Sequence, residues 1–276
     1  MKRVAWQWPG EKRIAVAFNV CLEAWSDGKA PGISPMGNPL PSGALDTMAI
    51  SWASYGVKRG IYRLMDALAA HNAKASVMTS AIIAERAPEA VKAVADAGHE
   101  VLSHSYTMDV IPALLSPEEN KQNIARCTSL LSEASGQPVR GWLSPRGTSG
   151  PDLPRLLAEA GHKWYGDVFD DDLPYVQHVG NLQIVAIPLA TDVNDMPFMK
   201  YGNPPRLMLE SFEENLAVAR GEDSPAMIDV TVHAHIFGHP RGAHTFGQIV
   251  ARAAAAPDVW IATRLEIAKF MLKQNP

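Results

Sequence analysis

Short apolar runs alternate with segments of helical periodicity along most of the chain. Residues 13–20 (RIAVAFNV) form a mainly apolar run that predicts a buried strand, and residues 59–71 place apolar side chains at helical spacing. The same pattern predicts further strands at 73–79, 100–103, 137–143, 164–168, 182–188, 227–233 and 258–263, and helices at 88–97, from 116 onward, and at 151–160, 206–220, 245–254 and 264–272. This alternation predicts an α/β fold with a mainly parallel sheet, in which functional groups gather at the carboxyl ends of the strands.

Turn and capping residues mark the ends of these elements. Ser116, followed by a proline and two acids, has the features of a helix start, and Gly98 suits a helix end. Residues 27–43 (DGKAPGISPMGNPLPSG) contain too much Gly and Pro for a helix or sheet interior. A loop of this length inside a compact domain is usually functional. No repeat or linker interrupts the pattern, so we expect a single domain over residues 1–276.

The composition is typical of a folded globular protein and excludes several partners. Of the 276 residues, 47% are hydrophobic and 20% are charged, which allows a sizeable core. The 25 Lys and Arg against 29 Asp and Glu give a net charge of −4, so the chain has no basic surplus for nucleic acid or an anionic membrane surface. The two cysteines, Cys21 and Cys127, do not make a disulfide framework. The N-terminal residues show no export signal and no apolar run is long enough to span a membrane, so we expect a cytoplasmic protein.

Three polar residues stand where predicted strands end. Glu23 follows the first strand, His104 follows the strand at 100–103, and His233 ends the strand at 227–233. A carboxylate and two imidazoles at one edge of a sheet form either an acid–base group or a metal site. Taken singly, each is better explained as a hydrogen-bonded polar group at the rim of a barrel, and the three together favour a functional role.

Other polar and aromatic residues are candidates for ligand contacts. Asn194 and Asp195 follow a predicted strand, where they bind amide or hydroxyl groups or form Asx turns, and Arg146 clamps a carbonyl or carboxylate or lies in a surface ion pair. A metal centred on the histidine-rich segment 233–244 is the less favoured interpretation, because its later histidines fall in a predicted loop. The full set of candidate contacts is Trp25, Trp142, Arg146, Asn194, Asp195 and His235.

Several enzyme classes lack their motifs in this chain. The sequence contains no G-x-S-x-G elbow, no Walker loop and no H-E-x-x-H. The acidic run at 170–172 is typical of a solvated loop. The residues at the strand ends therefore remain the main candidates for catalysis.

The chain resembles the polysaccharide deacetylase superfamily. IAVAFNVCLEAW stands at the place of its first motif, GHEVLSHSYTM at the second and VTVH at the last. YGDVFDDDLPY, IPLATDVNDMPF and PDVWIATRLEIAKF resemble the branch of metal-independent allantoinases and cyclic imide hydrolases. The resemblance covers nearly the whole chain and implies a distorted (β/α) barrel and a homo-oligomer.

Two departures from the superfamily's motifs bear on whether this chain binds a catalytic metal. Metal-dependent members of the superfamily carry two aspartates in the first motif and His-x-x-x-His in the second. This chain has Asn19 and Cys21 at the aspartate positions, and Met108 where the histidine after His104 belongs. A catalytic zinc site needs three protein ligands and an open position. The resemblance therefore implies the metal-independent branch, with no metal and no cofactor.

Further departures bear on the substrate. Allantoinase has Asn-Tyr-Glu-Glu where this chain has Cys-Leu-Glu-Ala at 21–24, and His-Cys-Arg where it has His-Ala-His at 233–235. Its Gly-Arg-Pro is Gly-His-Pro at 238–240. The pocket has thus lost charged groups, which favours a less polar cyclic amide, imide or lactam-like substrate over allantoin.

The residues and the resemblance together predict hydrolysis of a non-peptide carbon–nitrogen bond in a small cyclic amide or imide. Glu23 is the expected base, His233 the expected acid, and His104 the group that orients water or polarises the carbonyl. The loop at 27–43, with Trp25, is expected to cover the pocket.

Three alternatives remain open at the sequence level. The first is a metal-dependent amide hydrolase that uses Glu23, His104 and His233 as ligands. The second is a polysaccharide N-deacetylase. The third is a non-catalytic member of the superfamily that binds a small molecule.

Overall fold

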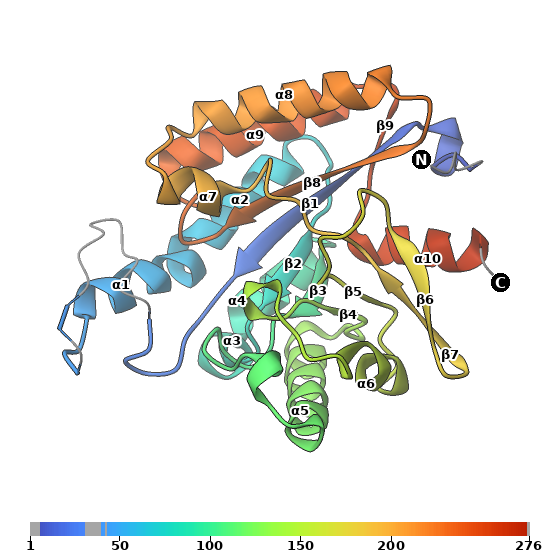
Figure 1. Ribbon diagram of the computed structural model, residues 1–276. Helices are drawn as coiled ribbons and strands as arrows, with labels where there is room; N and C mark the ends of the chain where they lie inside the picture. The colour runs from blue at the N-terminus through green and yellow to red at the C-terminus, as the bar shows by residue number, and fades with distance from the viewer. Residues whose placement is uncertain (1–5, 31–39, 42, 275–276) are drawn as a thin grey trace.

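A curled, mainly parallel β-sheet lies at the centre of the protein (Figure 1). The structure is a computed structural model that describes residues 6–30, 40–41 and 43–274. Its strands are β1 (Ile14–Leu22), β2 (Ser76–Thr79), β3 (Glu100–Ser103), β4 (Gly141–Trp142), β5 (Trp164–Tyr165), β6 (Tyr175–Val179), β7 (Leu182–Ala186), β8 (Ala226–His233) and β9 (Val259–Ile261).

The order of the strands explains why the barrel is distorted. The sheet runs β6-β7-β5-β4-β3-β2-β1-β8, and β9 pairs with the first half of β1. Every pair is parallel except β6 with β7. No ladder within the described residues joins β8 to β6 or β7, and an isolated bridge between Asn194 and Thr231 lies at that seam. The predicted distorted (β/α) barrel is confirmed.

Helices cover the outside of this sheet. They are α1 (Thr47–Tyr55), α2 (Ile61–Ala69), α3 (Ile82–Arg86), α4 (Pro88–Asp96), α5 (Pro117–Ser135), α6 (Leu153–Glu159), α7 (Asp195–Lys200), α8 (Arg206–Gly221), α9 (Pro240–Ala255) and α10 (Arg264–Gln274). In Figure 1, α8 and α9 lie side by side over β8, whereas α5 and α6 lie on the opposite side of the sheet. Among the described helices, none combines the length and apolar character needed to cross a membrane.

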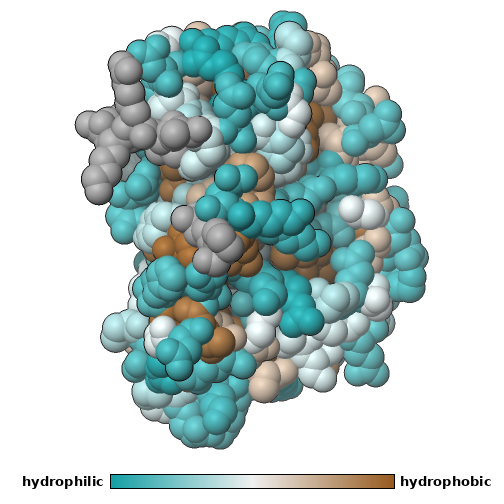
Figure 2. Space-filling model, turned by 90° about the vertical axis from the view of Figure 1, so that its right-hand side faces the viewer, coloured by the Kyte–Doolittle hydropathy of each residue, from teal (hydrophilic) through white to brown (hydrophobic). Residues whose placement is uncertain are grey.

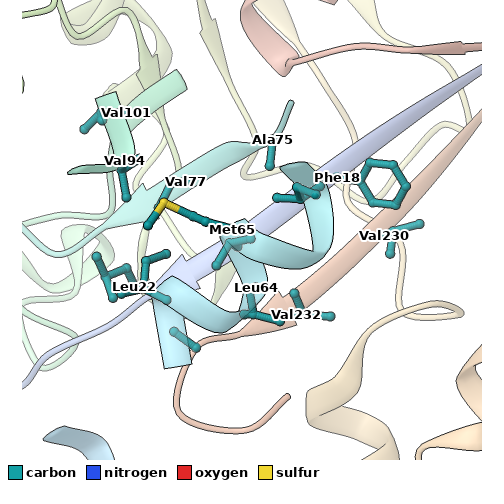
Figure 3. Close-up of a cluster of buried hydrophobic side chains, with 14 of the residues drawn as sticks. Phe18, Leu22, Leu64, Met65, Ala75, Val77, Val94, Val101, Val230 and Val232 are labelled. Atoms are coloured by element: carbon teal, nitrogen blue, oxygen red, sulfur yellow. The ribbon is translucent and has the colours of Figure 1, made fainter. Parts of the chain in front are cut away.

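Strand β1 is buried on both of its faces, as expected for the central strand of a parallel sheet. Its outward residues, including Phe18 and Leu22, pack with Leu64 of α2 and Val230 of β8 (Figure 3). Its inward residues alternate with these and end in Cys21. This alternation aims the next inward position after the strand, Glu23, at the interior of the barrel mouth.

A buried polar layer lies below that mouth. The Arg264 guanidinium pairs with the Asp229 carboxylate, and its Nε donates to Oδ1 of Asn19 (2.8 Å). Asn19 in turn donates from Nδ2 to Oδ1 of Asp229 (2.6 Å). Arg264 and Asn19 have no exposed surface, so pairing satisfies groups that would otherwise be costly to bury. Asn19, which stands at a family aspartate position, therefore has a structural role here.

One face of the molecule is predominantly polar. The face shown in Figure 2 is mostly hydrophilic, with hydrophobic residues in separate patches between polar ones. Scattered apolar residues of this kind are normal on a protein surface.

Two glycines hold the loop after β8 against the π-helical turn η2 (Gly56–Gly60). A Cβ atom added to Gly60 would overlap the carbonyl oxygen of Ala234, and one added to Gly238 would overlap the same oxygen. The backbones approach too closely for a side chain at either position. Because Ala234 lies between His233 and His235, this contact fixes the backbone that carries both histidines.

We expect Gly60→Ala to lower the free energy of unfolding by about 1–3 kcal/mol, the usual cost of forcing an extra carbon into a packed region. Urea denaturation measures the change. Gly247→Ala in α9 is the matched control, since its new Cβ would lie 3.7 Å from Ala67 Cβ and is expected to be neutral or to stabilise the helix. Equal stability of Gly60→Ala and the unmodified protein would contradict the close backbone contact.

Candidate active site

Three polar side chains meet at the carboxyl ends of the strands, on the side toward which β1 and β8 point in Figure 1. The Nε2 atoms of His104, after β3, and His233, at the end of β8, each lie 3.4 Å from Oε1 of Glu23, after β1. All three residues are buried. The ladder explains the meeting, because β1 pairs Cys21 with His233. The structure thus brings together the three residues that the sequence predicted to act together.

Glu23 carries a negative charge in this cluster. Burial alone would raise the pKa of its carboxyl group, because a buried charge loses hydration. The protonated His233 beside it outweighs burial and holds this pKa well below its usual range. An ionised carboxylate accepts hydrogen bonds and protons, so Glu23 is in the charge state that a base needs.

Asp195 fixes the position of His233. Its Oδ1 lies 2.6 Å from Nδ1 of His233, and its Oδ2 accepts from the backbone N–H groups of His233 (2.8 Å) and Phe237 (3.2 Å). The carboxylate has no exposed surface. This arrangement does not fit the predicted substrate contact: the first turn of α7 places Asp195 behind His233, where it orients the ring.

The charges around His233 favour its protonated form. Burial alone would lower the pKa of the imidazole, but its neighbours raise it well above the usual value. Asp195 and Glu23 supply this negative charge, since burial raises the pKa of the Cys21 thiol and keeps it neutral. His233 is therefore a proton donor with Nε2 directed at Glu23.

His104 presents a lone pair to the same carboxylate. Its Nδ1 lies 2.7 Å from the carbonyl oxygen of Leu143, which accepts and does not donate. Nδ1 therefore carries a proton, and in the tautomer with this single ring proton Nε2 is an acceptor. Oε1 of Glu23 and Nε2 of His104 are then two acceptors 3.4 Å apart. Water, with two hydrogens to donate, suits such a pair.

His235 supplies unused polar atoms beside the cluster. It is 1% exposed, and neither ring nitrogen has a hydrogen-bond partner among the described residues. Its Nε2 lies 3.9 Å from Oε2 of Glu23, and the rings of Trp25 and Trp52 approach it edge to face with centroids 5.6 and 4.6 Å away. Burial lowers its pKa to about 4, so the ring is neutral at neutral pH. Buried polar groups normally have partners, which points to a ligand contact.

A cavity of about 850 Å³ reaches this cluster at Glu23. Glu23 and Trp25 line it, together with apolar side chains that include Ile50, Val57 and Ile83. The predicted cover over this pocket cannot be compared in full, because residues 31–39 and 42 of the 27–43 loop lie outside the described residues.

The other predicted contacts lie elsewhere or have other partners. Trp142 is fully buried in the core that faces the helices, and its Nε1 donates to Oγ of Ser144 (2.9 Å), a placement that does not fit a substrate contact. Asn194 caps α7 by accepting from the N–H of Met196 (3.0 Å), in agreement with the Asx-turn alternative. Arg146 is exposed just after β4, with φ at 62°.

Sequence reasoning missed Asp167 and Trp52. Asp167 follows β5 at the same edge of the sheet, accepts from the N–H of Ser144 (2.7 Å), and keeps a second buried oxygen without a partner in the described part of the chain. Burial raises its pKa. Asp167 fell inside the strand predicted at 164–168, whereas β5 ends at Tyr165, so the sequence did not place it at a strand end. Trp52 lies on α1, which the hydrophobic pattern did not indicate.

The residues at this site can be compared with the metal ligands of the deacetylase family. Met108 stands where the second histidine belongs, and its backbone N–H donates to the carbonyl of Ala24 (2.9 Å). Within the described ranges, the potential ligand atoms that all lie within 4.8 Å of one another belong to Cys21, Glu23 and His233, without His104. The residues do not rebuild the metal site of the deacetylases, so we assign no catalytic step to a metal.

Comparisons with known proteins agree with this architecture. Residues 54–165 match the polysaccharide deacetylase family. A Schizosaccharomyces pombe protein whose name assigns it provisionally to the polysaccharide deacetylases is 24% identical over 98% of this chain and 93% of its own.

Two solved structures cover almost the whole chain. A Pseudomonas aeruginosa PAO1 protein described as a probable polysaccharide deacetylase has a TM-score of 0.87 and 26% identity, with 98% of this chain and 94% of its own covered. PuuE allantoinase has a TM-score of 0.86 and 26% identity, with 98% and 93% covered. Over nearly its whole length the chain is therefore similar to proteins of the polysaccharide deacetylase superfamily, among them PuuE allantoinase.

Proposed function

We propose that the protein hydrolyses the C–N bond of a small cyclic amide or imide by attack of water. The observation that carries this proposal is the buried Glu23 carboxylate, 3.4 Å from Nε2 of both His104 and His233, with His233 held by Asp195. This arrangement supplies an ionised base, a protonated acid and an acceptor pair for water at one point. The likeness to PuuE allantoinase supports the same class of reaction.

Each of these groups has a defined role in the proposed reaction. Water held by Glu23 and His104 attacks the carbonyl carbon, and Glu23 takes the proton that the water loses. The C–N bond then breaks, and His233 gives its Nε2 proton to the leaving nitrogen. Proton transfer from Glu23 to His233, whose facing atoms are 3.4 Å apart, restores the starting state. The ring-opened product carries a new carboxyl group.

The lining of the cavity supports an uncharged substrate. Glu23 and Trp25 border it together with the apolar side chains of Ile50, Val57 and Ile83. An uncharged ring loses less hydration than a charged group when it packs against apolar side chains. A flat, uncharged ring is therefore the favoured substrate.

The direct test is hydrolysis of succinimide, glutarimide, hydantoin, dihydrouracil and allantoin by protein treated exhaustively with a chelator, with metal content measured on the same sample. We expect ring opening of at least one uncharged imide or lactam in metal-free protein, and weaker activity on allantoin. Turnover that disappears on chelation and returns with zinc would contradict the mechanism and favour the metal-dependent alternative.

N-deacetylation of an acetylated amine is the second candidate. The cavity of about 850 Å³ is within the range of roughly 300–1,000 Å³ for sites that hold drug-sized ligands, and it exceeds what a single small ring fills. The family match supports the same chemistry on an open-chain acetamide. Release of acetate from N-acetylated sugars, without ring opening of any imide, would favour this candidate.

A further inference from the structure

Cys21 forms a compact group with two residues of the proposed acid–base cluster. Ligand atoms of Cys21, Glu23 and His233 all lie within 4.8 Å of one another, and all three side chains are buried. The fold sets this spacing, because Cys21 and Glu23 are alternate inward residues and Cys21 pairs with His233 in the β1–β8 ladder. The proposed reaction does not use Cys21.

The donor set suits a zinc ion. Thiolate sulfur, imidazole nitrogen and carboxylate oxygen are the three ligand types that Zn²⁺ takes in proteins. Asp195 occupies Nδ1 of His233 at 2.6 Å, which leaves Nε2 for a metal, and a carboxylate in that position is the usual partner of a metal-bound histidine. Three protein ligands leave a fourth position, and Glu23 borders the cavity through which an ion would enter.

We propose that Zn²⁺ binds to Cys21, Glu23 and His233 and that it inhibits the hydrolase. The inhibition rests on the proposed function, because an ion on these three residues occupies both the base and the acid. The ligand set differs from that of the family's deacetylases, since it recruits a cysteine and omits both His104 and position 108. Free zinc would then act as a negative regulator at a site that no longer uses a metal for catalysis.

The surroundings of the site favour a soft ion over a hard one. Sγ of Cys21 lies 3.6 Å from Sδ of Met78, so sulfur atoms line the inner side. His104 and His235 approach the outer side, 3.4 and 3.9 Å from the oxygens of Glu23. Mg²⁺ and Ca²⁺ prefer oxygen ligands, which only Glu23 supplies here. We therefore expect no competition from these ions.

The binding test uses the metal-free full chain. Titration with Co²⁺, a spectroscopic substitute for zinc, is expected to produce a thiolate-to-cobalt charge-transfer absorption that saturates at one ion per chain and is displaced by Zn²⁺. Cys21→Ser and Cys21→Ala are expected to lose this absorption. Cys127→Ser, at the other cysteine, buried in α5, is the matched control and is expected to keep it. Circular dichroism establishes that each variant is folded.

The activity test follows hydrolysis at increasing Zn²⁺. We expect inhibition of the unmodified protein and of Cys127→Ser at stoichiometric zinc, and at least a tenfold rise in the zinc concentration for half-inhibition in either Cys21 variant. Absence of the cobalt absorption, or equal inhibition of the Cys21 variants, would overturn the proposal. A metal-free protein that hydrolyses nothing would count against the proposed function instead, and the cobalt titration would still decide the zinc site.

Discussion

Replacement of Glu23 with glutamine is expected to lower kcat/KM by at least about a hundredfold, the lower end of what one proton-transfer group contributes. Glutamine has nearly the same shape but accepts no proton at neutral pH. The loss has a second cause, because the charge of Glu23 helps to hold the pKa of His233 high. The measurement is steady-state kinetics on whichever substrate of the panel is hydrolysed, with circular dichroism to show that the fold is intact.

The matched control is Glu159→Gln, an exposed residue of α6 that pairs with Arg155 on the surface. We expect unchanged kinetics, since an exposed i,i+4 pair contributes little to stability and lies away from the cluster. Near-normal turnover of Glu23→Gln would remove Glu23 from the mechanism. It would also shift support to a reaction in which His104 alone takes the proton of water.

The main features of the fold followed from the sequence because parallel sheets obey simple rules. The apolar run at 13–20 overlaps β1 (Ile14–Leu22), the strand expected at 100–103 is β3, and the helix expected from Ser116 begins with a capping box at that residue. Carboxyl ends of parallel strands share one edge, so residues that follow such strands meet. Glu23, His104 and His233 were therefore predictable as a group, although they lie far apart in the chain.

The roles of single residues were harder to predict, because they depend on which way a side chain points. Trp142 lies in a two-residue strand, too short for alternation to show which face it occupies. Asp195 follows a predicted strand, but the helix α7 that turns it beneath His233 has only six residues, too few for a helical period to show. The hairpin strand β6 is only half-buried, so it lacks the continuous apolar run of the other strands.

The proposed mechanism also accounts for the departures from the family's motifs. Met108 and Asn19 stand where the deacetylase motifs have two of their conserved polar residues, whereas Asp195 and Glu23 still favour a protonated His233. A reaction without a metal would lack a Lewis acid worth several kcal/mol in the transition state. An imide carbonyl is more electrophilic than an acetamide carbonyl, so it needs less of this help. A metal-free site and an activated ring substrate are therefore consistent with each other.

Replacement of Asp195 with asparagine tests whether His233 works as an oriented acid. The asparagine amide keeps the size of the side chain and can still accept from a backbone N–H, but it loses the charge that favours imidazolium. In hydrolases with a histidine–aspartate pair, the same change lowers kcat by about 10⁴ because the histidine takes the wrong tautomer. We expect a fall in kcat of about 10²–10⁴ for Asp195→Asn, with a much smaller change in KM.

A purely structural role for Asp195 would not move the pH profile, and this distinguishes the two explanations. Activity needs His233 protonated, so it is lost as the pH rises through the pKa of His233 in the active site. Asp195 and Glu23 raise that pKa, and removal of the Asp195 charge lowers it. The alkaline limb of the kcat profile should therefore move to lower pH in Asp195→Asn, and it should stay in place in Asp192→Asn, an exposed control in the same segment. A lower kcat with an unmoved alkaline limb would mean that Asp195 only supports the loop after β8.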